Sequence, residues 1–100
     1  MKEIWNNATI AEAPKDDLIR IEGNWYFPPS SLKRQYFEDS DHRTTCFWKG
    51  EAQYYDIIAD DKRNEFGAWY YPHPMNGSVE RVKKDFTDYV AFWNGVTITE

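Results

Sequence analysis

Turn-forming residues interrupt this sequence so often that they leave little room for a long helix. Gly, Pro, Asn and Asp recur at intervals of about 8–12 residues, and the segments between them are rich in Val, Ile, Thr and aromatic residues. Such segments are typical of β-strands, because branched and aromatic side chains pack well on a pleated surface. The sequence therefore predicts a mainly β protein with a barrel-like or folded-over sheet.

The chain has to build its core without covalent cross-links. Its 100 residues include one cysteine, so no internal disulfide can form. Aromatic residues make up 18% of the sequence, and each ring can bury on the order of 150–250 Å². We therefore expect residues 1–100 to fold as a single domain around an aromatic core.

Two asparagine turns predict a hairpin at each end of the chain. Asn6-Asn7 lies between two β-compatible runs, and asparagine tolerates a positive φ. Asn94-Gly95 is the stronger signal, because this dipeptide favours the tight turns that join antiparallel strands. Pairing across it would set Trp93 opposite Val96.

Between these hairpins the sequence predicts short strands and one or two short helices. A helix is expected over Ser31–Phe37, because a serine can cap its start, and a helical turn or loop is expected over 78–86. Strands are expected over 18–23, 24–28, 44–50, 51–60 and 66–72.

Charge and hydropathy restrict the partners. The net charge is −5 and the pI is about 5.0, which argues against nucleic-acid binding, since that requires a basic face. The basic group Arg81–Lys84 is followed at once by Asp85 and is expected to be a solvated face. No apolar run is long enough to cross a membrane. We expect a cytoplasmic protein.

The segment 40–57 holds the candidate catalytic residues His42, Cys46 and Glu51. His42 follows Asp41 and could act as a base, or could be a turn histidine bonded to the backbone. Cys46 could be a nucleophile, although a lone cysteine is more often a small buried apolar residue. Lys49-Gly50-Glu51 could bind and activate a ligand, or could be a salt-bridged turn.

The same segment and the aromatic run Ala68–Pro74 supply candidate ligand-binding residues. Polar side chains beside rings are the usual composition of a pocket, although adjacent aromatic residues are more often core. Gly50 would let another chain segment or a ligand approach the backbone closely. The candidates are Thr44, Thr45, Lys49, Tyr54, Trp69 and Tyr71.

Metal binding is poorly supported. The single cysteine and the two histidines, His42 and His73, cannot form the paired-cysteine sites that hold structural zinc. We expect no metal site and no cofactor.

Four sequence blocks resemble a known family. They are Tyr26–Pro29, Ser40–Ile57, Ala68–Pro74 and Asp88–Ile98, and their order is that of the domain of unknown function 427 family, also labelled a nucleotidyltransferase domain. A typical member has proline where this chain has Phe47. The resemblance implies a compact folded-sheet domain of the β-tent, Mss4-like kind. Relatives of that fold usually bind zinc through cysteine pairs that are missing here.

The sequence leaves the function open between two main hypotheses. The first is a domain that binds a small polar ligand, with or without catalysis, in a pocket between 44–54 and the rings of Trp69 and Tyr71. The second is a non-catalytic interaction module. The family label adds nucleotidyl transfer as a third hypothesis. The sequence has no paired aspartates of the kind that hold the metal ions in such enzymes.

Overall fold

The computed structural model describes all 100 residues and confirms the mainly β prediction. Nine strands and one short α-helix follow one another, with three 3₁₀ segments at Lys15–Asp17, Pro29–Ser31 and Arg34–Tyr36. The strands are β1 (Lys2–Trp5), β2 (Ala8–Glu12), β3 (Ile19–Ile21), β4 (Asn24–Tyr26), β5 (Phe37–Cys46), β6 (Gly50–Ala59), β7 (Lys62–Tyr70), β8 (Val90–Phe92) and β9 (Thr97–Thr99), and the helix is α1 (Ser78–Val82).

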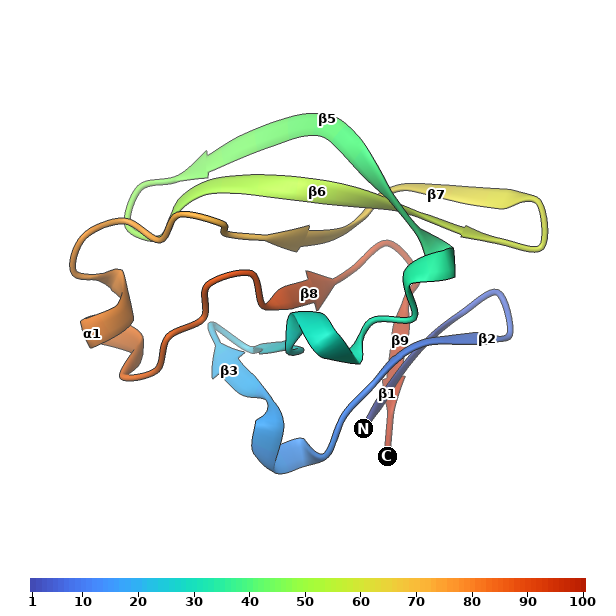
Figure 1. Cartoon of the computed structure of the whole chain (residues 1–100), viewed down its shortest axis with the longest axis horizontal. Helices are drawn as coiled ribbons and strands as arrows, with labels where there is room; N and C mark the ends of the chain where they lie inside the picture. The colour runs from blue at the N-terminus through green and yellow to red at the C-terminus, as the bar shows by residue number, and fades with distance from the viewer.

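The strands form three antiparallel sheets (Figure 1). The largest has the order β5-β6-β7-β8, a second has the order β2-β1-β9, and β3 and β4 form a hairpin. Phe27, just after β4, exchanges two backbone hydrogen bonds of 2.8 Å with Val90 of β8. The β3–β4 hairpin is thereby joined to the edge of the large sheet.

One of the two terminal hairpins is confirmed and the other is wrong. Asn6-Asn7 joins β1 to β2 as expected. Asn94-Gly95 does form a turn, with φ of 52° and 86°, and the Val96 amide donates to the Trp93 carbonyl at 3.2 Å. The strands then separate, because β8 pairs with β7 and β9 pairs with β1. The bend at Asn94-Gly95 depends only on its own residues. The strands that pair with β8 and β9 are decided instead by which sheet offers each of them an open edge.

The helix expected over Ser31–Phe37 is also wrong. Two 3₁₀ segments occupy most of that range, and Phe37 already begins β5 opposite Ile57. The Lys33 amide donates to the Ile10 carbonyl at 2.9 Å, which ties the backbone to β2 rather than to a helical turn. The helical turn expected over 78–86 is present as α1.

Two apolar clusters fill the interior, one on each side of β4 and β8. The neighbours Tyr26 and Phe27 belong to different clusters, and so do the neighbours Val90 and Ala91. Successive residues of a strand point to opposite faces, so these two segments contribute to both cores. The aromatic residues of the sequence therefore cover both faces of the central strands.

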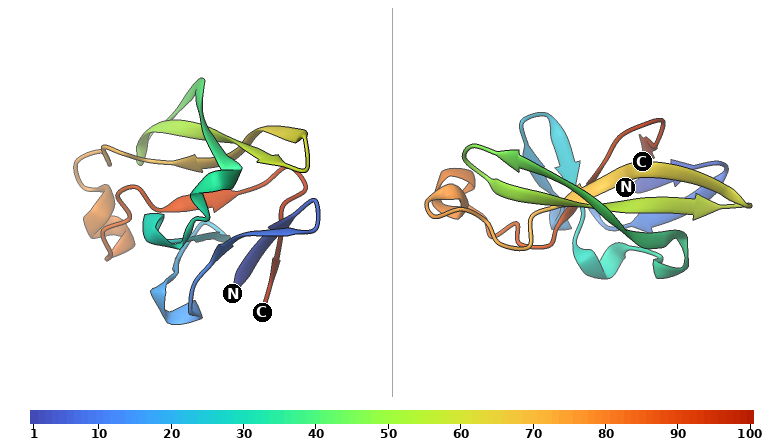
Figure 2. Two further views of the ribbon diagram at one scale, coloured as in Figure 1. Left: turned by 45° about the vertical axis from the view of Figure 1, so that its right-hand side comes forward. Right: turned by 90° about the horizontal axis from the view of Figure 1, so that it is seen from above.

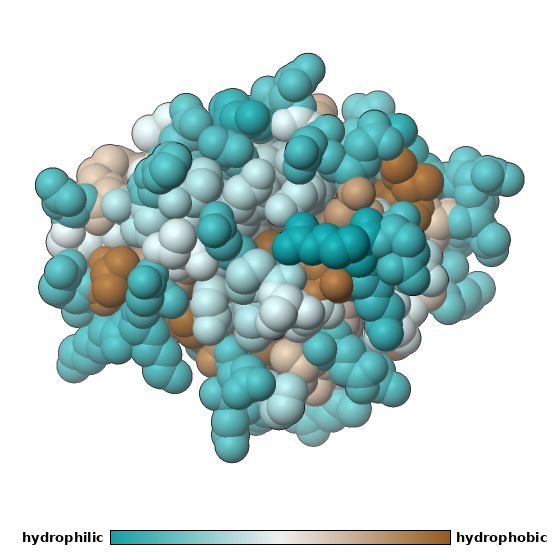
Figure 3. All heavy atoms as spheres, viewed as in Figure 1, coloured by the Kyte–Doolittle hydropathy of each residue, from teal (hydrophilic) through white to brown (hydrophobic).

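The turns of the hairpins gather at the two ends of the molecule. The β5–β6 turn lies at the same end as α1, and the β1–β2 turn lies at the other end (Figures 1 and 2). The face viewed in Figure 3 is mostly hydrophilic, with apolar surface in small separate patches. No helix is long and apolar enough to cross a bilayer.

Candidate functional site

The turn between β5 and β6 positions the most distinctive triplet of the sequence. Cys46 pairs with Gly50, and Phe47–Lys49 form the turn between them. Gly50 has a φ of 116°, and a Cβ there would lie 3.1 Å from the His73 carbonyl oxygen. The Met75 amide donates to the Lys49 carbonyl at 2.9 Å. The close approach expected at Gly50 is therefore made by the loop at 73–75, which fixes the backbone of Lys49.

Lys49 is a buried cation with a charged partner. Its side chain is 8% exposed, and its ammonium donates to the carboxylate of Glu22. Burial lowers the pKa of Lys49, but the hydrogen bond with Glu22 and the nearby Tyr26 oxygen outweigh it and raise that pKa. Lys49 is therefore protonated at neutral pH. An ammonium has three N–H donors, and the hydrogen bond from Lys49 to Glu22 uses one of them.

Rings lie around this ammonium and line a small open cavity. The cavity has a volume of about 170 Å³. Its lining comes from the β5–β6 turn, from β6 and β7 and from the residues that follow β7 and β8: Lys49, Tyr54, Trp69, Tyr71 and Trp93. The Lys49 nitrogen lies 5.4 Å from the centroid of the Tyr71 ring, within the range of a cation–π contact.

Hydrogen bonds hold the polar tips of these rings. The Thr44 hydroxyl and the Tyr54 hydroxyl are 2.9 Å apart. The Trp69 indole donates to the Tyr26 hydroxyl at 3.2 Å. Burial raises the pKa of both Tyr26 and Tyr71, so their hydroxyls stay neutral at physiological pH. The cavity is thus a fixed arrangement of one charge and several neutral hydroxyl and indole groups.

The structure brings four of the expected ligand-binding residues together at one cavity and leaves the other candidates outside its lining. Lys49, Tyr54, Trp69 and Tyr71 line one cavity, and Thr44 bonds to one of them. Thr45 and Glu51 face each other across β5 and β6 and are exposed. Lys49 in the turn is buried and pairs with Glu22, whereas Glu51 on β6 is exposed, so the triplet Lys49-Gly50-Glu51 is not a salt bridge between its own two charges.

His42 and Cys46 lie apart on β5. The His42 ring stacks on Phe66, with centroids 4.2 Å apart, and meets Tyr54 edge-on at 4.7 Å. Cys46 is half-buried and packs against the apolar cluster around Tyr26. Four residues of extended strand separate them, about 13 Å at roughly 3.3 Å per residue. His42 therefore supports the wall of the cavity from behind Tyr54 and cannot activate the thiol of Cys46.

Three residues of the site were missed by the sequence analysis. Glu22 lies in the β3–β4 turn, 27 residues before Lys49. Tyr26 in β4 and Trp93 just after β8 come from segments that only the fold brings to β7. No local sequence pattern indicates a long-range ion pair, so Glu22 had no signal. Tyr26 and Trp93 lie in the sequence blocks that resemble the family, and this was their only signal.

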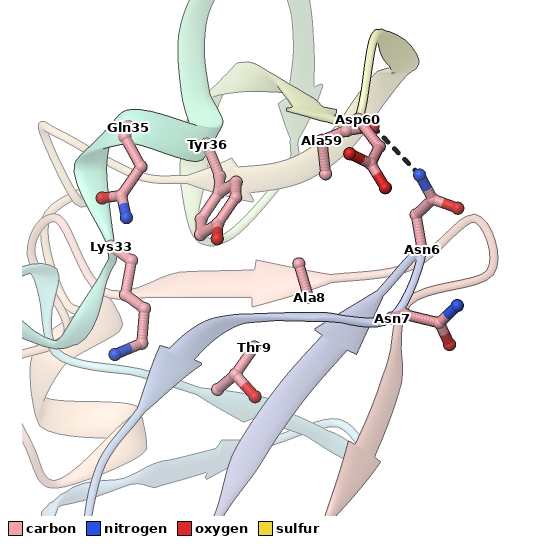
Figure 4. A pocket seen from close by; sticks show the side chains of 9 residues that line it. All are labelled: Asn6, Asn7, Ala8, Thr9, Lys33, Gln35, Tyr36, Ala59 and Asp60. Carbon is pink, nitrogen blue, oxygen red and sulfur yellow. Dashed lines mark hydrogen bonds between the residues drawn. The ribbon is translucent and has the colours of Figure 1, made fainter.

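A wider hollow lies at the opposite end, beside the β1–β2 turn (Figure 4). It has a volume of about 550 Å³ and is lined mainly by short polar side chains. Asn6 is held there by a hydrogen bond of 3.0 Å to the Ala59 carbonyl. Lys33 and Asp60 are its only charged residues, and both are exposed. Neither of these charges is buried, whereas Lys49 is, so we favour the Lys49 cavity.

No group of three or more His, Cys, Asp or Glu side chains is placed to share a metal ion.

The sequence matches the family described as Domain of unknown function (DUF427) over residues 2–99. The chain therefore belongs to this family, as the resemblance indicated. No curated protein sequence matches the chain.

Proposed function

For this member of the DUF427 family, we propose that the Lys49 cavity binds a small ligand carrying an anionic or hydrogen-bond-accepting group. The observation that carries the proposal is a protonated lysine, 7% exposed, at the wall of a cavity otherwise lined by rings. Lysine is rarely buried to this extent in a protein unless it has a charged partner or a function. Glu22 is the partner, and its side chain is 56% exposed.

The surroundings of Lys49 would strengthen its hold on a ligand. Rings on several sides would lower the local dielectric constant around Lys49, and electrostatic attraction grows as that constant falls. Tyr54 would add a hydroxyl whose orientation is fixed by Thr44. The flat faces of Trp69 and Trp93, edge-to-face with centroids 5.8 Å apart, would accept a planar or short apolar portion. The volume of about 170 Å³ suits a ligand of a few heavy atoms or the head group of a larger one.

The charge state of Lys49 supports binding more than acid–base chemistry. A lysine acts as a base or nucleophile when its pKa is lowered toward neutrality, whereas here the pKa is raised. His42, Cys46 and Glu51, the candidate catalytic residues, do not meet at the cavity. The proposal is therefore a binding domain, and catalysis is not part of it.

Tryptophan fluorescence offers a direct test, since two indoles line the cavity. A panel of small carboxylates, inorganic phosphate and nucleotides is titrated into the protein, and melting temperature is followed in parallel. We expect at least one anion to shift the emission and raise the melting temperature. Lys49→Met should abolish both responses, and Lys62→Met, an exposed lysine at the start of β7, should retain them. A response that survives Lys49→Met would contradict the proposal.

A non-catalytic interaction module is the second candidate. Phe47 is 84% exposed at the tip of the β5–β6 turn, and Met75 beside it is 41% exposed. An apolar ring at a turn tip has no role in the core, so it suits a contact with a second protein. Sedimentation at increasing concentration, with Phe47→Ser as the comparison, tests whether that protein is another copy of this chain.

Nucleotidyl transfer, the activity in the family label, has no observation in its favour beyond that label. The nucleotides in the anion panel test whether a substrate of that class binds at the cavity.

A further inference from the structure

A second buried titratable side chain lies in a different part of the molecule, and it has no hydrogen-bond or ion-pair partner. Glu3 is in the middle strand of the β2-β1-β9 sheet, between Ala11 of β2 and Ile98 of β9. It is 4% exposed. Acidic residues are almost never buried this deeply without a paired charge. Burial alone raises its pKa, with no neighbouring charge or hydrogen bond contributing.

The Glu3 side chain borders a cavity of about 120 Å³ where the three sheets meet. Trp25 of β4 and Phe92 of β8 supply rings, and Val96 and Ile98 supply aliphatic surface. The remaining lining comes from Gly23 and Asn24 in the β3–β4 hairpin. Glu3 is the only titratable residue among them. For scale, a dry cavity of about 150 Å³ accepts benzene, so this one suits a smaller group.

The combination of a carboxylate and rings selects for positive charge. Ionising a buried carboxyl that has no counter-charge is costly, and a bound cation would lower that cost. The faces of Trp and Phe rings attract cations, and aromatic cages for ammonium groups use this effect. Two cations already lie over Trp25, the Arg20 guanidinium at 4.6 Å and the Lys15 ammonium at 5.7 Å from the ring centroid. Neither lines the cavity, so its carboxylate is left for an external cation.

We propose that Glu3, Trp25 and Phe92 form a site for a small organic cation, a primary ammonium group of about methylammonium size. The carboxylate accepts hydrogen bonds from the ammonium, and the rings contact its charge and its methyl group. This site shares no residue with the Lys49 cavity, so it stands or fails independently of the function proposed above.

The test is a titration of the full ¹⁵N-labelled chain with methylammonium chloride, followed by amide and indole chemical shifts. At pH 8.5 we expect saturable shifts at the Gly23 and Asn24 amides and at the Trp25 indole. Sodium chloride at equal concentration serves as the ionic-strength control. A short lysine-containing peptide, compared with methylammonium, shows whether the ammonium is taken free or on a peptide side chain.

Variants make the result decisive. Glu3→Gln keeps the shape and removes the charge, so affinity should fall at least about tenfold, equivalent to about 1.4 kcal/mol. Glu12→Gln, at an exposed residue that ends β2, is the matched control and should bind as the unchanged protein does. Val96→Phe keeps Glu3 but fills the cavity, and should also abolish binding. Absence of saturable shifts, shifts produced equally by sodium chloride, or full binding by Glu3→Gln would overturn the proposal.

Discussion

Lys49 and Glu3 are both less than a tenth exposed, but the protein treats them in opposite ways. Lys49 has Glu22 as a partner, and the pair raises the pKa of Lys49 and keeps it charged. Glu3 has no partner, and burial raises its pKa from 4.5 to about 8, which keeps it neutral at physiological pH. Burial alone therefore does not define a charged site. The partner decides whether the buried group is a permanent charge or one that titrates near neutral pH.

The largest expected effect of this difference is on the dependence of stability on pH. Between pH 4.5 and about 8 the unfolded chain has released the Glu3 proton and the folded chain retains it. The folded state then binds more protons, so raising the pH favours unfolding. The free energy of unfolding should fall by roughly 5 kcal/mol across this window, at about 1.4 kcal/mol per pH unit.

Urea unfolding at several pH values measures this slope. The glutamine in Glu3→Gln cannot release a proton, so the free energy of unfolding of this variant should not fall with rising pH in this way. Equal slopes in the two proteins would show that a hydrogen-bond partner or water satisfies Glu3, and the contrast with Lys49 would disappear.

The next largest effect should come from the backbone that holds Lys49. Gly50→Ala places a Cβ 3.1 Å from the His73 carbonyl at a φ of 116°, where side chains are strained. We expect a loss of about 3 kcal/mol in stability and a displaced Lys49, seen as loss of the anion response. The pH slope assigned to Glu3 should remain, because that residue lies in another sheet. A simultaneous loss of both would mean that the two sites are not independent.

Glu22→Gln and Lys49→Met separate the two sides of the ion pair. Removing Glu22 leaves a buried ammonium without its counter-charge and should cost about 2 kcal/mol. Removing Lys49 leaves Glu22, which is 56% exposed and can be hydrated, so Lys49→Met should cost less than about 1 kcal/mol. Thermal or urea unfolding gives both values. The reverse order would show that Lys49 contributes mainly by packing.

The fold could be predicted as far as its signals are local. The Asn6-Asn7 turn, the strand-rich pattern and the helical turn near α1 were all readable, because each depends on neighbouring residues. The Asn94-Gly95 hairpin was not, because the turn residues fix the bend but not the strand that pairs beyond it. The helix expected after Pro29 failed for the same reason, since the Lys33 amide bonds to a distant strand.

The residues of the candidate site also divide into those with a local sequence signal and those without one. Lys49, Tyr54, Trp69 and Tyr71 were expected together because charged and aromatic residues lie close in two neighbouring strands. Glu22 could not be anticipated, since nothing at the β3–β4 turn indicates a lysine 27 residues later. Glu3 carries no signal at all, because a glutamate near a chain end ordinarily faces water. Its burial follows only from the pairing of β1 with strands on both sides.

The smallest expected effect concerns the polar contact at the edge of the Lys49 cavity. Thr44→Val keeps the shape of the side chain and removes the hydroxyl that lies 2.9 Å from the Tyr54 hydroxyl. Thr44 is exposed, so water can replace the lost bond and stability should fall by less than about 1 kcal/mol. The anion that answers the Lys49 test should nevertheless bind several-fold more weakly, because Tyr54 would no longer be held in one orientation. Thr45→Val, the neighbouring threonine that faces Glu51, is the matched control and should change neither quantity. If the two valine variants bind alike, the Tyr54 hydroxyl does not contact the ligand, and binding at this cavity rests on the Lys49 charge and the rings alone.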